Sequence, residues 1–116
     1  MILALFLFGI QNANAQAQLS SSFPTKNQTL KIAPSLVWLE FNGDLLNFEK
    51  QQIHRLTVTN AKKVRVDIGG PIVGGARIST KLKAGLPSGR YLVSYRIVSE
   101  DGHPVAGSYS FTYKPK

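Results

Sequence analysis

The chain has 116 residues, no cysteine and a formal net charge of +8 at pH 7. A chain of this length closes one small hydrophobic core and leaves no room for a separate catalytic domain. Without cysteine it has no disulfide, thiolate metal ligand or thiol nucleophile, so packing alone must hold the fold.

The chain opens with an apolar run, MILALFLFGI, which is too short to cross a membrane because a spanning helix needs about 20 residues. The triplet ANA at 13–15 has the small-x-small form of a signal-peptidase site. We expect residues 1–15 to be a signal peptide and residues 16–116 the mature domain, with cleavage after Ala17 as the alternative. No Lys or Arg precedes the run, which leaves a buried N-terminal helix as the competing interpretation.

No later apolar stretch approaches spanning length, so we expect the mature chain to be periplasmic or secreted and not to span a membrane.

From Leu19 onward, apolar and polar residues alternate with the period of a β-strand rather than a helix. In LVWLEF (36–41), every second residue is apolar on one face. The run RYLVSYRIV (90–98) is apolar on both faces, which indicates a central strand. The other runs with this period are IHRLTV (53–58), KVRVDI (63–68), ARISTKLK (76–83) and SYSFTY (108–113).

Turn-forming residues separate these runs. GGPIVGG (69–75) is expected to be a flexible hairpin loop, because neither a helix nor a Lys-Ser/Thr pair follows to make it a phosphate loop. About seven short strands with such turns predict an all-β fold, an immunoglobulin-like antiparallel β-sandwich. The alternation predicts that seven side chains face its interior: Val64, Val66, Tyr91, Val93, Tyr95, Tyr109 and Phe111.

The positive charges are spread over strand faces without the interleaved aromatic residues that a base-stacking surface requires, so nucleic acid is not an expected partner. Solvated strand faces explain the charge, and attraction to anionic lipid headgroups or an acidic partner is the alternative. No serine lies in a G-x-S-x-G motif. His54 alternates with Leu56 and Val58 and is expected to pack against the sheet.

One turn carries residues with metal-binding chemistry, SEDGHP (99–104). Gly102 permits a tight turn, and Pro104 favours an extended conformation for His103. Asp101 and His103 can then converge on one point. A carboxylate oxygen and an imidazole nitrogen suit Cu(II) or Zn(II), with copper favoured by the general affinity order. The alternative is structural, with Asp101 capping its own turn and His103 packing on the sheet edge.

The segment YLVSYRIVSEDGHPVAGSYSFTY (91–113) closely resembles the end of the CopC-like copper-resistance family, small secreted or periplasmic copper carriers with a β-sandwich fold. LSSSFP (19–24) is similar to the first strand of that family, LVWLEF (36–41) to its second, and GLPSGRYLVSYRIVS (85–99) to its turn and central strand. The resemblance covers nearly the whole expected mature chain and is specific in its last third.

The resemblance implies a Cu(II) site made of an Asp-x-His pair and an N-terminal histidine, which gives its side chain and its amine. Asp101 and His103 match the pair, but Gln16 stands where the histidine is expected. Asn42 and Gly43 stand where many members have an acidic residue. An amide oxygen is a poor copper ligand beside imidazole, and an N-terminal glutamine can cyclise and lose its free amine. No methionine remains for a Cu(I) site after position 1.

The sequence therefore leads to two hypotheses. The first is a Cu(II) carrier of copper homeostasis or resistance, whose depleted site binds copper weakly through Asp101, His103 and the amine of Gln16, completed by water or another carboxylate. The second is a β-sandwich interaction module that kept the fold after losing the copper site. A membrane copper transporter or an anionic surface stays open as a further partner. An oxidative copper enzyme of this fold needs the missing histidine, so no enzyme is expected.

Overall fold

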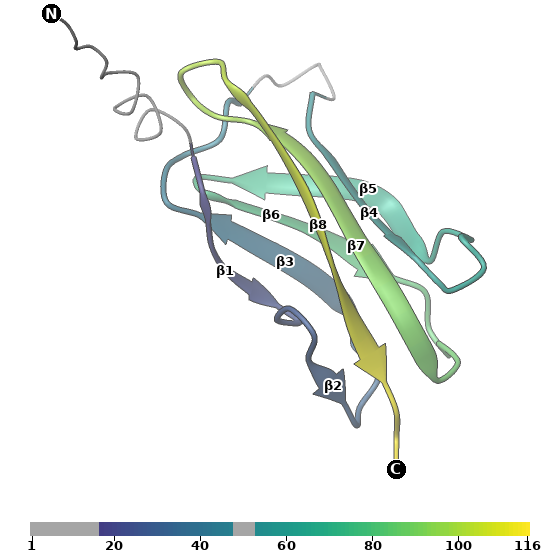
Figure 1. Cartoon of the computed structure of the whole chain (residues 1–116). Coiled ribbons are helices and arrows are strands. Elements are labelled where there is room, and N and C mark those ends of the chain that lie inside the picture. The colour runs from purple at the N-terminus through teal and green to yellow at the C-terminus, as the bar shows by residue number, and fades with distance from the viewer. Residues whose placement is uncertain (1–16, 48–52) are drawn as a thin grey trace, which may run out of the picture.

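The computed structural model describes residues 17–47 and 53–116, which form two four-stranded β-sheets packed face to face (Figure 1). The first sheet has the strand order β1-β3-β6-β5 and the second β2-β8-β7-β4. Neighbouring strands are antiparallel except β2 and β8, which run parallel. The strands are β1 (Leu19–Phe23), β2 (Thr29–Leu30), β3 (Leu36–Phe41), β4 (Arg55–Thr59), β5 (Asp67–Gly74), β6 (Arg77–Leu82), β7 (Gly89–Val98) and β8 (Pro104–Tyr113).

The predicted all-β sandwich is confirmed, and the described ranges contain eight strands, of which β2 has two residues. Within the ranges that the structure describes, no helix is long and apolar enough to cross a membrane. The expected signal peptide lies outside the described residues.

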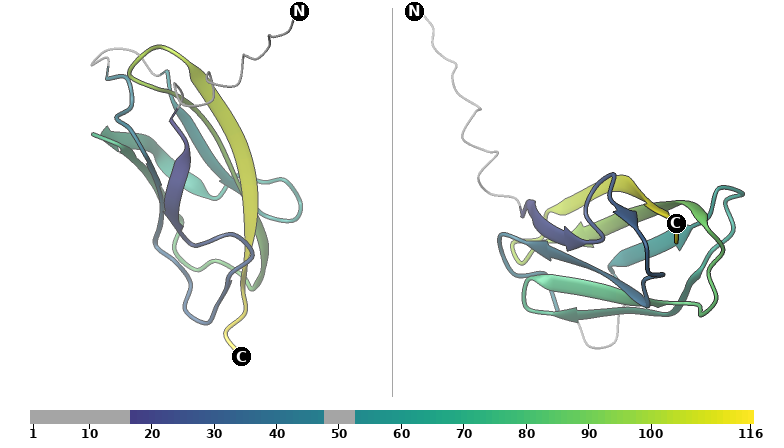
Figure 2. Two further views of the ribbon diagram at one scale, coloured as in Figure 1. Left: turned by 60° about the vertical axis from the view of Figure 1, so that its left-hand side comes forward. Right: turned by 90° about the horizontal axis from the view of Figure 1, so that it is seen from below.

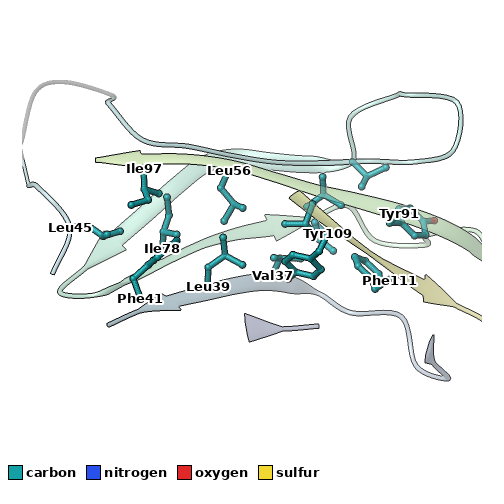
Figure 3. Close-up of a cluster of buried hydrophobic side chains, with 14 of the residues drawn as sticks. Val37, Leu39, Phe41, Leu45, Leu56, Ile78, Tyr91, Ile97, Tyr109 and Phe111 are labelled. Atoms are coloured by element: carbon teal, nitrogen blue, oxygen red, sulfur yellow. The ribbon is translucent and has the colours of Figure 1, made fainter. Parts of the chain in front are cut away.

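The core lies between the two sheets and is built by the alternation seen in the sequence (Figure 3). Val37, Leu39 and Phe41 of β3 are all buried, and Leu39 is fully so. From the second sheet, the rings of Tyr91 and Phe111 stack with centroids 5.4 Å apart. Burying one such side chain stabilises the fold by about 1.5–3 kcal/mol, so these few residues account for much of what holds the sheets together.

Of the seven side chains expected to face the interior, Val64 does not, because it is 53% exposed. The other six pack in or against the core. Val64 follows Lys63, whose φ of 67° belongs to a turn, and Asn60 Oδ1 accepts a hydrogen bond from the Val64 N–H at 3.0 Å. The side chain of Asn60 thus closes a turn over residues that alternate like a strand, and β5 begins only at Asp67.

The expectation of a flexible loop at GGPIVGG (69–75) was wrong, because β5 continues to Gly74 and pairs with β6. Gly69 and Gly70 have φ values of 81° and 75° and interrupt the register. Pro71 has no N–H to offer a further strand. β5 is an edge strand of the first sheet, so this irregular segment protects an open edge from pairing with another chain.

β7 is a central strand, as predicted, between β8 and β4. The reason differs from the one expected, because its outer face is open to solvent and Leu92 there is 43% exposed.

The sandwich has two distinct ends (Figure 2). Val98 pairs with Pro104 and Gly89 with Tyr113, so the β7–β8 turn and the start of β7 lie at opposite ends. We name the first the hairpin end, which also holds residues 17–18, the segment 42–47 and the β5–β6 turn. The opposite end holds the segments 24–28, 31–35, 60–66, 83–88 and 114–116.

A buried carboxylate closes the corner between β4 and β5. Asp67 is 8% exposed; its Oδ1 accepts hydrogen bonds from the Val58 N–H at 2.8 Å and from Arg65 Nε at 2.8 Å. Arg65 Nη2 lies 2.7 Å from Asp67 Oδ2. Burial acts to raise the pKa of Asp67, but the hydrogen bonds from Arg65 and Val58 outweigh it and hold the pKa below its ordinary value.

We expect Asp67→Asn to lower the free energy of unfolding at pH 7 by about 1–3 kcal/mol, because an amide cannot serve both Arg65 and the Val58 N–H equally well. Because the pKa of Asp67 is lower in the folded than in the unfolded state, its carboxylate stabilises the fold at pH values above the ordinary carboxyl pKa. This stabilisation is lost as the pH falls through the pKa of Asp67 in the folded state. Urea unfolding should therefore show that the difference in free energy of unfolding between wild type and variant becomes smaller as the pH is lowered. A gap that stays constant with pH would contradict this role.

Candidate metal centre

The β7–β8 turn is held by its own backbone. The Ser99 N–H donates to the His103 carbonyl oxygen at 2.9 Å, and the Gly102 N–H donates to the Ser99 carbonyl oxygen at 2.8 Å. Gly102 has a φ of 92°, which a residue with a side chain rarely adopts. The glycine singled out in the sequence therefore makes the tight turn that was predicted.

Asp101 and His103 meet at this turn, as the sequence predicted. Asp101 Oδ2 lies 3.1 Å from His103 Nδ1, and the side chains are 45% and 52% exposed. The other carboxylate oxygen, Oδ1, lies 3.4 Å from the His103 backbone nitrogen. One oxygen of Asp101 thus faces the backbone of the turn and the other faces the imidazole of His103. The carboxylate therefore caps its own turn and pairs with the histidine at the same time, on an exposed surface.

The buried Ser99 holds the Asp101 carboxylate in place. Its hydroxyl donates a hydrogen bond to Asp101 Oδ1, and the residue is only 4% exposed. This hydrogen bond, followed by that with His103, lowers the pKa of Asp101 from its ordinary value. The carboxylate is therefore ionised across the neutral range. This role of Ser99 was not predicted, although the S-x-D-x-H spacing was the available signal.

His54 is half-buried at the base of the turn, and its predicted packing against the sheet is confirmed. Its Nδ1 accepts a hydrogen bond from the Val98 N–H at 3.2 Å, so Nε2 carries the proton and donates to the Leu46 carbonyl oxygen at 2.6 Å. Both ring nitrogens are engaged with backbone groups. His54 therefore acts as a structural brace between the segment 42–47 and the end of β7.

The segment 42–47 also connects the hairpin to the start of the described chain. The Gln18 N–H donates to Asn42 Oδ1, and the Asn42 N–H donates to the Gln18 carbonyl oxygen, each at 2.8 Å. The Glu100 N–H donates to the Asp44 carbonyl oxygen at 3.0 Å. Residues 17–18 and the Asp101–His103 pair therefore lie at the same end of the sandwich.

No third ligand joins the pair within residues 17–47 and 53–116, where no three His, Cys, Asp or Glu side chains are grouped to hold a metal ion. The Asp44 carboxylate lies near Gly75 of the β5–β6 turn. Gln16, which the resemblance aligns with an N-terminal histidine, lies outside the described residues.

Residues 19–114 match the CopC domain family. The chain belongs to this family. It is 34% identical over 116 residues to the copper transport protein CutJ of Bacillus subtilis (strain 168), covering 97% of this chain but only 21% of CutJ. It is 31% identical over 110 residues to copper resistance protein C of Escherichia coli, covering 89% of this chain and 85% of that protein. The chain thus spans about a fifth of the first relative and most of the second.

Two solved structures share the fold. CopC from Methylosinus trichosporium OB3b superposes with a TM-score of 0.74 at 24% identity, covering 85% of this chain and 94% of that one. PcoC, a methionine-rich copper resistance protein from Escherichia coli, superposes with a TM-score of 0.68 at 29% identity, covering 84% of this chain and 98% of PcoC. The present chain has a single methionine, at position 1, so it departs from PcoC in that respect.

We expect Ser99→Ala to raise the pKa of Asp101 toward its ordinary value, because the variant loses the hydroxyl that hydrogen-bonds the carboxylate. Carbon-13 NMR of the Asp101 carboxyl group during an acid titration measures this directly. Ser108→Ala on β8 is the matched control and should leave the pKa of Asp101 unchanged. An equal pKa in wild type and Ser99→Ala would show that the serine does not set the charge of the pair.

Proposed function

We propose that this protein is a copper-binding protein of copper homeostasis or resistance, and that Asp101 and His103 bind Cu(II) as its cargo. The observation that carries the proposal is the pairing of an ionised carboxylate and an imidazole, 3.1 Å apart, on an exposed turn of a CopC-family chain. The names of the two relatives, a copper transport protein and a copper resistance protein, support the same assignment.

The spacing of the two donors suits one ion. Two neighbouring ligands in a square-planar site, each about 2.0 Å from the metal, are about 2.8 Å apart. The separation of 3.1 Å between Asp101 Oδ2 and His103 Nδ1 is close to this value. The turn therefore already brings the two donor atoms to a separation at which one ion can contact both.

We further propose that the site is depleted and binds copper weakly. A square-planar Cu(II) ion takes four good donors, and the pair supplies two. The resemblance gives the remaining protein donors to an N-terminal histidine, where this chain has Gln16. Water, the amine of Gln16 or another carboxylate completes the site. An open, two-donor site suits reversible transfer of an ion rather than its permanent retention.

The same proposal assigns no catalytic role and places the protein in the periplasm or outside the cell. The apolar run and the ANA triplet at 13–15 support export, and a membrane copper transporter is the partner that a copper carrier implies.

A second candidate is a β-sandwich interaction module that binds no metal. The absence of a three-donor group within the described residues favours it. The two candidates differ in whether the Asp101–His103 pair binds copper at all.

We expect Cu(II) to bind at one site of the processed protein and His103→Ala to abolish this binding, since a lone carboxylate is a poor copper ligand. Titration followed by the visible absorption of Cu(II) measures the stoichiometry. His54→Gln is the matched control and should keep the affinity within about threefold of wild type, because both nitrogens of His54 already bond the backbone. Wild-type binding by His103→Ala would leave the pair as turn residues and favour the interaction module.

We expect Gln16→His, in protein processed to begin at that residue, to tighten Cu(II) binding at least a hundredfold, or about 2.7 kcal/mol. The variant adds an imidazole and keeps an amine that does not cyclise. The position of residues 17–18 at the hairpin end supports the idea that a new ligand at residue 16 reaches the pair.

Competition against a chelator of known affinity measures the change, with the double variant Gln16→His, His103→Ala as control. An unchanged affinity in the single variant would mean that residue 16 does not reach the pair. A gain that survives in the double variant would indicate a new terminal site that does not use His103.

A further inference from the structure

The end of the sandwich opposite the Asp101–His103 turn is strongly basic. Seven exposed lysines lie in its segments: Lys26, Lys31, Lys62, Lys63, Lys83, Lys114 and Lys116. None of the three ion pairs in the described part of the chain includes any of them. The one side-chain carboxylate that the described residues place at this end is Asp67, which is buried and already bound to Arg65.

The exposed carboxylates gather at the hairpin end. Asp44, Glu100 and Asp101 all lie in its segments and all are exposed. The described residues of those segments, 17–18, 42–47, 75–76 and 99–103, include no Lys or Arg. The lysines therefore gather at one end of the sandwich and the exposed carboxylates of the loops at the other, although Arg55, Arg77 and Arg96 lie on strands nearer the hairpin end. An anionic surface will therefore attract the lysine-rich end, where no exposed carboxylate side chain of the described residues opposes it.

Two exposed aliphatic side chains stand among these lysines. Ile32 is 83% exposed and follows Lys31 between β2 and β3; Val64 is 53% exposed and follows Lys63 between β4 and β5. Neither belongs to the core cluster. A lysine beside an exposed aliphatic residue matches the boundary of a lipid bilayer, where cations meet phosphate groups and short apolar side chains enter the acyl region.

We propose that this lysine-rich end docks on a membrane surface containing anionic lipids, with Ile32 and Val64 at the acyl boundary and the Asp101–His103 turn facing away. The lysines come from separate segments around the end of the sandwich rather than from one strand, and Figure 1 shows the backbone of these segments. The adjacency of a lysine to each exposed aliphatic residue, Lys31 to Ile32 and Lys63 to Val64, favours a lipid surface over an acidic protein. The proposal goes beyond the copper function and does not depend on it.

The chain has no cysteine, so single variants can carry one environment-sensitive fluorophore. We expect labels on Ile32→Cys and Val64→Cys to shift to the blue with phosphatidylglycerol–phosphatidylcholine vesicles and not with phosphatidylcholine alone. The matched control is Ala106→Cys, an exposed site near the hairpin end, whose label should not respond. Unresponsive labels at 32 and 64, or an equal response at 106, would overturn the proposal.

The charge contribution is tested in the unlabelled chain without metal. We expect the triple variant Lys31→Gln, Lys62→Gln, Lys63→Gln to weaken partition onto the anionic vesicles by about a hundredfold. Partition is measured by co-sedimentation over a range of vesicle concentrations.

The matched control removes the same charge from strand positions nearer the hairpin end, where Arg55, Arg77 and Arg96 are exposed. Replacing these three with Gln should weaken partition far less, by under about tenfold. Equal losses in the two triple variants would mean that net charge alone is responsible and would overturn the proposal. Failure of the wild-type chain to bind anionic vesicles would do the same and would direct the search to an acidic protein.

Discussion

The ladder between β7 and β8 is the constraint on which the rest of the structure depends. Ten residue pairs run without interruption from Gly89–Tyr113 to Val98–Pro104. A slip of one residue would turn the inward side chains of one strand to the solvent, taking Phe111 out of the core. The same slip would change which residues form the turn that holds Asp101 and His103. The packing of the sandwich and the geometry of the candidate metal centre are therefore set by one register.

Contacts from outside the hairpin make its turn firmer than an isolated one. The Leu46 N–H donates to the Val98 carbonyl oxygen at 2.9 Å. The Glu100 N–H donates to the Asp44 carbonyl oxygen. The proposed copper site gains from such support, because little further ordering is needed when a ligand binds.

Local signals decided what the sequence could predict. β3 was predicted over the residues that it occupies, because both the alternation and the flanking turns lie within a few residues. β5 was misplaced because Gly69 and Gly70 indicate a loop locally, whereas pairing with β6 across the sheet makes a strand. Asp101 and His103 converge within one turn and could be predicted as a pair. The Gln18–Asn42 contact joins residues 24 positions apart, and no local pattern reveals it.

The two proposals, on copper and on the membrane, support each other physically. A site with the two proposed donors would have a low affinity for Cu(II). Such a site can still be useful when the protein is concentrated where the ion must be delivered. Confinement to a surface raises the effective concentration of a binding partner without any new contact. The lysine-rich end would supply that confinement. The hairpin end, where Asp44 and Glu100 lie near the Asp101–His103 pair, would then face away from the membrane toward arriving cations. Thus the net charge of +8, which would repel Cu(II) if it were spread evenly, need not oppose binding.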